Sequence, residues 1–209
     1  AEVDATRAGA KLAAPEATVI AVTMTHEATA IRPVLKAGCR VFGENRIQEA
    51  AGKWPALRDD YPDIELHLIG PLQSNKAAQA VALFDMIQTV DRLKIARTLA
   101  EEMQKQDRHI PVLIQVNTGL EPQKAGIEPD KVLAFVDQCI REHGLDVRGL
   151  MCIPPFDENP GPHFALLRKL ADEAELPVRS MGMSGDYKSA IDFGATHVRV
   201  GSAIFGLRQ

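Results

Sequence analysis

Eight short apolar segments, each followed by a longer stretch with helical periodicity, constrain the fold of this chain more than any other sequence feature. The short segments are rich in β-branched residues, and the longer ones repeat apolar residues every three or four positions, which is typical of parallel βα units. The expected strands cover residues 17–22, 39–42, 64–69, 85–89, 111–116, 145–150, 177–181 and 196–200. Eight consecutive units of this kind predict an α/β fold.

Two α/β architectures share this local pattern, a (β/α)₈ TIM barrel and a doubly wound open sheet. No GxGxxG motif follows the first strand, and no linker or change in composition divides the sequence into two halves. We therefore expect one (β/α)₈ barrel domain over residues 1–209, a length that a single core can support. Along it, Gly38 is expected to end the first helix, and Asp91 to cap the helix after the fourth strand.

Charge and cysteine content narrow the classes of partner. Lys and Arg number 24 against 28 Asp and Glu, so a net charge of −4 provides no general attraction for nucleic acid or anionic membranes. Cys39, Cys139 and Cys152 are far apart and lack metal-site spacing, which favours reduced thiols in the cytoplasm. No apolar run is long enough to span a membrane. We expect a cytoplasmic monomer or weak dimer that holds any anionic ligand by local donors, with no nucleic-acid, membrane or metal partner.

Glycine and serine follow the last two expected strands, where a barrel places its chemistry. Gly182, Ser184 and Gly185 precede one helix, and Gly201 and Ser202 precede a terminal helical turn. Backbone amides and hydroxyls at such positions bind anions, and barrels recurrently bind phosphate after strands seven and eight. A phosphate site is one interpretation. Ordinary turns and helix caps are the other.

Two further polar residues lie within expected strands. Arg199 stands between valines on the last strand, and a guanidinium is rarely buried without a partner, which favours a functional role. His67 alternates with Glu65 and Ile69, so it fits either a ligand contact or a hydrogen-bonded core histidine. The sequence pattern leaves both interpretations of His67 open.

At these strand ends the sequence resembles the pyridoxal phosphate homeostasis protein family, the single-domain relatives of the N-terminal barrel of alanine racemase. The similarity extends over nearly the whole chain. The motifs are AVTMTH at 21–26, VFGENRIQE at 41–49, HLIGPLQSNK at 67–76, QVNTG at 115–119, GLMCIPP at 149–155, SMGMSGDY at 180–187 and HVRVGSAIFG at 197–206. So many ordered motifs make a chance similarity improbable.

The resemblance implies a pyridoxal phosphate site and assigns residues to it. Ser184, Gly201 and Ser202 match the family's phosphate-binding residues, and Arg199 matches the arginine expected to face the pyridine nitrogen. The implied cofactor-binding residues are Met24, Asn45, His67, Met183, Ser184, Arg199, Gly201 and Ser202. The implied function is to hold pyridoxal phosphate and deliver it to apo-enzymes that depend on it.

One departure from the family pattern changes the expected chemistry. The family has AVSKT, whose lysine forms a Schiff base with the cofactor aldehyde, whereas Met24 stands at that position here. A thioether cannot form an imine. Lys36 and Lys53 fall on outer helices by periodicity and are not expected to replace it. We therefore expect reversible, non-covalent binding of pyridoxal phosphate.

Two enzymatic functions are alternatives to a carrier. The resembling racemases use a tyrosine from a separate C-terminal domain, but only Tyr61 and Tyr187 occur in these 209 residues and we expect no second domain, which disfavours a racemase. The other alternative is a barrel enzyme acting on a phosphorylated metabolite. It would use Glu44, His67 or Cys152 as the acid–base group.

Overall fold

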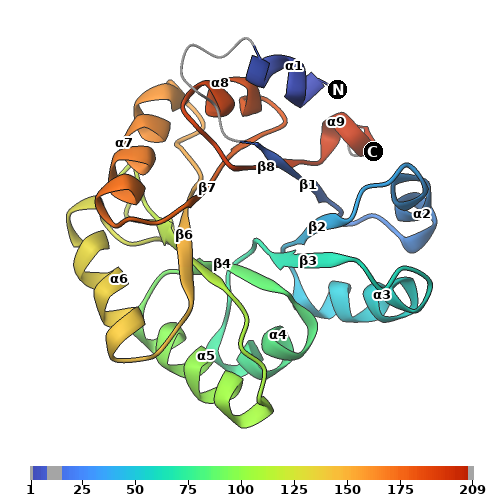
Figure 1. The fold of residues 1–209 in the computed structure, drawn as a ribbon, viewed down its shortest axis with the longest axis horizontal. Coiled ribbons are helices and arrows are strands. Elements are labelled where there is room, and N and C mark those ends of the chain that lie inside the picture. The colour runs from blue at the N-terminus through green and yellow to red at the C-terminus, as the bar shows by residue number, and fades with distance from the viewer. Residues whose placement is uncertain (1, 9–15, 207–209) are drawn as a thin grey trace.

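The computed structural model describes residues 2–8 and 16–206 and has the architecture of a closed barrel of parallel strands surrounded by helices (Figure 1). Each strand pairs with its neighbours in sequence, and β1 closes the barrel against β8. The strands are β1 Thr18–Val22, β2 Val41–Glu44, β3 Glu65–Leu68, β4 Met86–Val90, β5 Val112–Val116, β6 Val147–Cys152, β7 Val178–Met183 and β8 His197–Val200. The predicted (β/α)₈ barrel and each of its eight expected strands are confirmed.

Helices follow the strands and form the outer layer of the barrel (Figure 1). They are α1 Glu2–Ala8, α2 Ala28–Lys36, α3 Ile47–Asp60, η1 Ser74–Lys76, α4 Ala77–Leu83, α5 Leu93–Gln106, η2 Pro129–Lys131, α6 Val132–Arg141, α7 Pro160–Glu173, α8 Tyr187–Asp192 and α9 Ser202–Phe205. Helix α1 was not expected, and it packs against α8, where Lys188 Nζ lies 3.0 Å from Glu2 Oε1. Within residues 2–8 and 16–206, no helix has the length and apolar character needed to cross a membrane.

Of two helix ends predicted from the sequence, one is confirmed and the other is wrong. Gly38 follows α2 with φ +94°, a left-handed conformation that glycine adopts without strain, as expected. The expected cap by Asp91 is wrong, because α5 begins after Arg92 and no side chain caps it. The Asp91 carboxylate instead pairs with the Arg92 guanidinium.

Apolar packing divides into a large cluster between strands and helices and a small separate one on β4, β5 and β6. The small cluster consists of Met86, Leu113 and Met151. Beside it, Gln88 on β4 accepts a hydrogen bond from Ser180 on β7 at 2.7 Å. Because β4 and β7 are not neighbours in the barrel, this bond crosses the barrel interior. The interior is therefore partly polar, unlike the branched apolar filling usual in such barrels.

Candidate cofactor site

A cavity of about 860 Å³ lies at the carboxyl ends of the strands. It is lined by Val22, Met24, His26, Asn45, Ile69, Gly70, Pro71, Ile153, Met183, Ser184, Gly185, Arg199, Gly201, Ser202 and Gly206. These residues come from segments far apart in sequence that meet because parallel strands end at one rim. The cavity is large enough for a small cofactor.

The loops after β7 and β8 are joined by a direct hydrogen bond. The Gly201 amide donates to Ser184 Oγ at 3.1 Å. Gly182, near the end of β7, has φ +93°, and a Cβ there would come within 2.5 Å of the Ala190 Cβ, so this backbone conformation requires glycine. The first amides of α9 have no acceptor within the helix, as at any helix start. Together these loops present hydroxyls and amides to the cavity, a set suited to an anion.

Arg199 supplies the positive charge of the cavity. It is on β8 and only 4% exposed, and it donates from Nη1 to Ser180 Oγ at 2.7 Å and from Nη2 to the Cys152 carbonyl at 2.8 Å. Burial lowers the pKa of Arg199, but a guanidinium remains charged at any physiological pH. Among the described residues that line the cavity, Arg199 alone carries a permanent charge.

Asn45 contributes an acceptor without a partner. Its Oδ1 is buried and makes no hydrogen bond to the residues that the structure describes. Gly70 packs directly on the Asn45 backbone, since a Cβ at Gly70 would lie 2.2 Å from the Asn45 carbonyl oxygen. A buried acceptor left unpaired costs about 1–3 kcal/mol, which a donor on a bound ligand could recover.

The loop after β1 carries Met24 and forms one wall of the cavity. Thr25 adopts the left-handed region at φ 64°, and the next side chain, His26, stacks on Phe205 with ring centroids 4.6 Å apart. His26 and Phe205 come from nearly opposite ends of the chain. Their stacking links the loop after β1 to α9 beside the cavity.

Lys53 stabilises the same loop through hydrogen bonds to its backbone. It lies on α3, an outer helix, as expected, but its amine is buried and donates to the carbonyls of Thr23 at 2.8 Å and His26 at 3.0 Å. It also pairs with Glu44 Oε1 at 2.8 Å, to which the Trp54 indole donates at 3.0 Å. Lys53 therefore holds the backbone around Met24 and does not line the cavity.

All the cofactor residues expected from the sequence line this cavity except His67. His67 is fully buried, with Nε2 2.7 Å from Glu65 Oε1 and Nδ1 2.9 Å from Gln88 Nε2. It is the hydrogen-bonded core histidine of the two interpretations that the sequence left open. Glu44 and Cys152, the other acid–base candidates, also lie outside the cavity lining.

Several lining residues were not among the cofactor-binding residues that the resemblance implied. They are Val22, His26, Ile69, Gly70, Pro71, Ile153, Gly185 and Gly206, of which Gly185 belongs to the candidate anion loop expected after the seventh strand. The partners of Arg199 and His67 carried a usable signal, because Ser180 and Gln88 are polar residues inside apolar strands. No local pattern indicated the stacking of His26 on Phe205.

Comparison with known proteins first defines the class of this barrel. A family model described as alanine racemase, N-terminal domain, matches residues 5–209. The pyridoxal phosphate homeostasis protein of Vibrio alginolyticus is 40% identical over 201 residues, covering 91% of this chain and 86% of the relative. The chain therefore belongs to the pyridoxal phosphate homeostasis protein family, as the motifs suggested.

Solved structures agree with this assignment. PipY of Synechococcus elongatus PCC7942, solved without PLP, is 39% identical with a TM-score of 0.88, covering 98% of this chain and 99% of that one. The same protein with PLP bound is 38% identical with a TM-score of 0.84 and equal coverage. The barrel thus shares the fold of these proteins over almost its whole length.

Proposed function

We propose that this protein binds pyridoxal phosphate non-covalently in the cavity and serves in the cytoplasm to hold the cofactor and deliver it to apo-enzymes. The observation that carries the proposal is the Ser184–Gly201 hydrogen bond, which joins two loops of hydroxyls and amides in the cavity that Arg199 also lines. The names of the curated relatives and the PLP-bound structure of PipY support the choice of ligand.

The donors and acceptors of the cavity fit this cofactor. Ser184 and Ser202 would hold the phosphate through their hydroxyls, and Gly201, whose amide is bonded to Ser184 Oγ, would bring the start of α9 against it, where a negative charge is favoured. Arg199 would face the ring nitrogen; because a guanidinium has no lone pair, it would keep that nitrogen an unprotonated acceptor. The unpaired Asn45 Oδ1 would accept from a hydroxyl of the ligand.

The residues present favour release over covalent storage. When bound, pyridoxal phosphate supplies an aldehyde conjugated to an electron-withdrawing ring. Met24 has no amine with which to capture the aldehyde, and no described residue lining the cavity is a lysine. Lys53 keeps its amine engaged with Glu44 and two carbonyls. Retention would then depend on non-covalent contacts alone.

A phosphorylated-metabolite enzyme is the competing proposal, and the cavity supports it less. Its acid–base candidates, Glu44, His67 and Cys152, do not line the cavity. Burial also raises the pKa of the Cys152 thiol to about 12, which removes its thiolate at neutral pH. Neither Tyr61 nor Tyr187 is among the described lining residues, so the cavity offers no tyrosine for racemisation.

The proposal is tested by titrating the protein with pyridoxal phosphate. We expect saturable binding, competition by inorganic phosphate, and weaker binding of unphosphorylated pyridoxal. Arg199→Gln should weaken binding at least about 10-fold, because it removes a charge-assisted donor, while Arg148→Gln on the outer surface should not. Selective stabilisation by a sugar phosphate, with none by pyridoxal phosphate, would support the competing proposal. Competition by phosphate in the unaltered protein keeps the test valid if Arg199→Gln fails to fold.

A further inference from the structure

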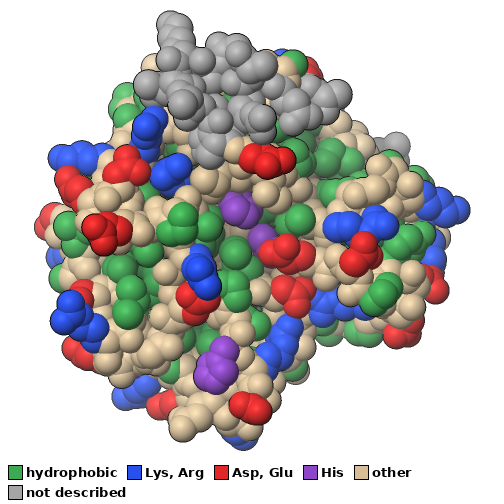
Figure 2. Space-filling view, viewed as in Figure 1, with side chains coloured by type: hydrophobic (Ala, Val, Ile, Leu, Met, Phe, Trp, Pro, Cys, Tyr) green, Lys and Arg blue, Asp and Glu red, His purple; other side chains and the backbone are tan. Residues whose placement is uncertain are grey.

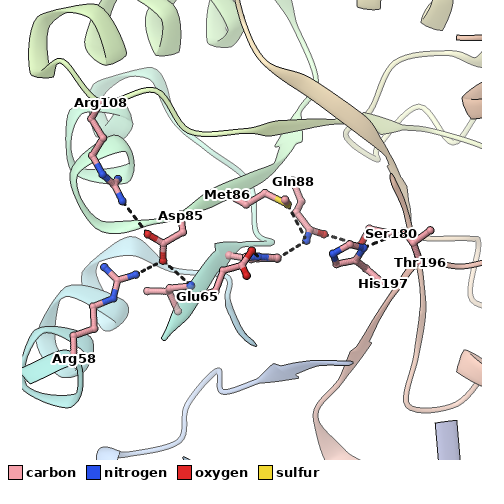
Figure 3. A network of polar contacts seen from close by, with 11 residues as sticks. Arg58, Glu65, Asp85, Met86, Gln88, Arg108, Ser180, Thr196 and His197 are labelled. Carbon is pink, nitrogen blue, oxygen red and sulfur yellow. Dashed lines mark hydrogen bonds and ion pairs between the residues drawn. The ribbon is translucent and has the colours of Figure 1, made fainter. Parts of the chain in front are cut away.

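A continuous series of hydrogen bonds runs from the cavity through the barrel interior. We call it the barrel-core network; its members are Glu65 and His67 on β3, Gln88 on β4, Ser180 on β7 and Arg199 on β8. Its distances are 2.7 Å for Glu65–His67, 2.9 Å for His67–Gln88, 2.7 Å for Gln88–Ser180 and 2.7 Å for Ser180–Arg199. Figure 3 shows Glu65, Gln88 and Ser180 reaching towards one another from separate strands.

The network joins the cavity to the protein surface. Arg199 lines the cavity, and His67, Gln88 and Ser180 have no exposed surface at all. The Glu65 side chain at the other end is 48% exposed. Figure 2 shows histidine and acidic side chains near the centre of one face of the barrel. A buried polar series of this kind is costly unless each member is satisfied, so its proton positions are tightly constrained.

One assignment of donors and acceptors satisfies every bond in the network. A guanidinium only donates, so one lone pair of Ser180 Oγ accepts from Arg199, and the hydroxyl proton of Ser180 is directed at the Gln88 Oε1 that faces it. The Gln88 amide nitrogen is then turned to His67, whose Nδ1 must accept. With the amide in this orientation, the ring proton of His67 belongs on Nε2, from which it would donate to the Glu65 carboxylate.

We propose that the barrel-core network positions the Arg199 guanidinium, with Ser180, Gln88 and His67 as positioning residues and His67 held as the neutral Nε2–H form. Arg199 has two protein acceptors, the Cys152 carbonyl and the Ser180 hydroxyl. The carbonyl is fixed by β6, whereas a hydroxyl rotates unless its own proton is engaged. Gln88 engages that proton and so directs the Ser180 lone pair at Arg199.

A second proton on His67 would disturb the network as far as the cavity. Protonated Nδ1 would face the Gln88 NH₂ group donor against donor, so the amide would turn over. Ser180 would then face two donors, from Gln88 and Arg199, and its own proton would lose its acceptor. The titratable groups facing His67 are Glu65 on its own strand and His197 on β8, with the His197 ring centroid 6.1 Å away, and Arg199 acts in turn on His197.

The first test needs no ligand and so stands apart from the proposed function. In the protein labelled with ¹⁵N-histidine, the His67 ring, assigned by its loss in His67→Asn, should carry its proton on Nε2 at neutral pH. Gln88→Glu places a second carboxylate against the ring and should protonate both nitrogens, whereas Gln104→Glu on the exposed side of α5 should change nothing. A proton on Nδ1 in the unaltered protein, or an unchanged ring in Gln88→Glu, would overturn the proposal.

The second test measures how firmly the network positions the Arg199 guanidinium. Gln88→Met removes the amide, and exchange of the Arg199 guanidinium protons with water should rise roughly 3- to 10-fold. Leu113→Ala, in the neighbouring apolar cluster, should not change that exchange, although it also removes interior packing. Unchanged exchange in Gln88→Met, or an equal rise in Leu113→Ala, would overturn the positioning role.

The same variants distinguish this inference from the proposed function. Only the expected effect of the network on pyridoxal phosphate binding rests on the proposed function. If pyridoxal phosphate binds, Gln88→Met should weaken binding by roughly 3- to 10-fold, and unchanged affinity would contradict the positioning role. If the unaltered protein binds no pyridoxal phosphate while both spectroscopic results hold, the proposed function fails and the network stands.

Discussion

The backbone amide of Gly201 donates a 3.1 Å hydrogen bond to the hydroxyl of Ser184, joining the loops that follow β7 and β8. Each loop on its own has an ordinary turn composition. Their contact makes them one surface beside Arg199, and that surface is the part of the cavity best suited to a phosphate.

The Ser184–Gly201 contact is tested by Ser184→Ala. The change removes both an acceptor for the Gly201 amide and a hydroxyl of the cavity, so affinity for pyridoxal phosphate should fall roughly 3- to 10-fold. Calorimetric titration measures the affinity of each protein for pyridoxal phosphate. Ser189→Ala, on α8 and outside the cavity lining, is the control. Equal affinity in Ser184→Ala and the unaltered protein would argue against phosphate at these loops.

The position of Met24 is tested by Met24→Lys. We expect the introduced amine to bond covalently with pyridoxal phosphate, giving an adduct on that residue after borohydride reduction that mass spectrometry can map. The unaltered protein should give no adduct in the 21–26 segment, because Met24 cannot form an imine. Met183→Lys places an amine elsewhere in the cavity and should react less. Equal labelling of both variants would mean that position 24 has no special orientation towards the aldehyde.

The buried pair of Lys53 and Glu44 should matter for stability. Lys53→Met leaves the fully buried Glu44 carboxylate without its cation, so the free energy of unfolding in urea should fall by about 3 kcal/mol. The backbone around Met24 should also exchange its amide protons faster, since two carbonyls lose their donor. Lys169→Met, at an exposed surface pair, should change stability by less than about 0.5 kcal/mol. A similar small effect for Lys53→Met would show that the pair contributes little.

The pH dependence of the free energy of unfolding should reflect the lowered pKa of His197. Burial, followed by repulsion from His67 when that ring is charged, lowers the pKa of His197 to about 4 from its ordinary value of 6.5. Between these values the unfolded chain binds more protons than the folded protein, so stability should fall as the pH falls from 6.5 to 4.

Urea unfolding across this pH range measures the effect. His197→Gln should flatten the dependence by on the order of 3 kcal/mol, whereas His109→Gln, at an exposed position, should leave it unchanged. Parallel curves for the unaltered protein and His197→Gln would contradict the depressed pKa.

The sequence by itself determined the barrel and part of its cavity. Strand periodicity is local, and parallel strands deliver their carboxyl ends to one rim, so Ser184, Arg199 and Gly201 could be grouped before any contact was known. The Asp91 cap failed because capping depends on where α5 begins, a boundary that periodicity does not fix to one residue.

Only the tertiary structure decided what the polar residues inside the barrel do. His67 suited a ligand contact or the core equally well, and its place depended on Gln88, one strand away, and through it on Ser180, 92 residues further along the chain. The amine of Lys53 turned inward for a similar reason, since its acceptors lie on β2 and in the loop after β1. Strand register and the closure of the barrel decide which residues form hydrogen bonds across its interior, and neither of them can be read from the periodicity of the sequence.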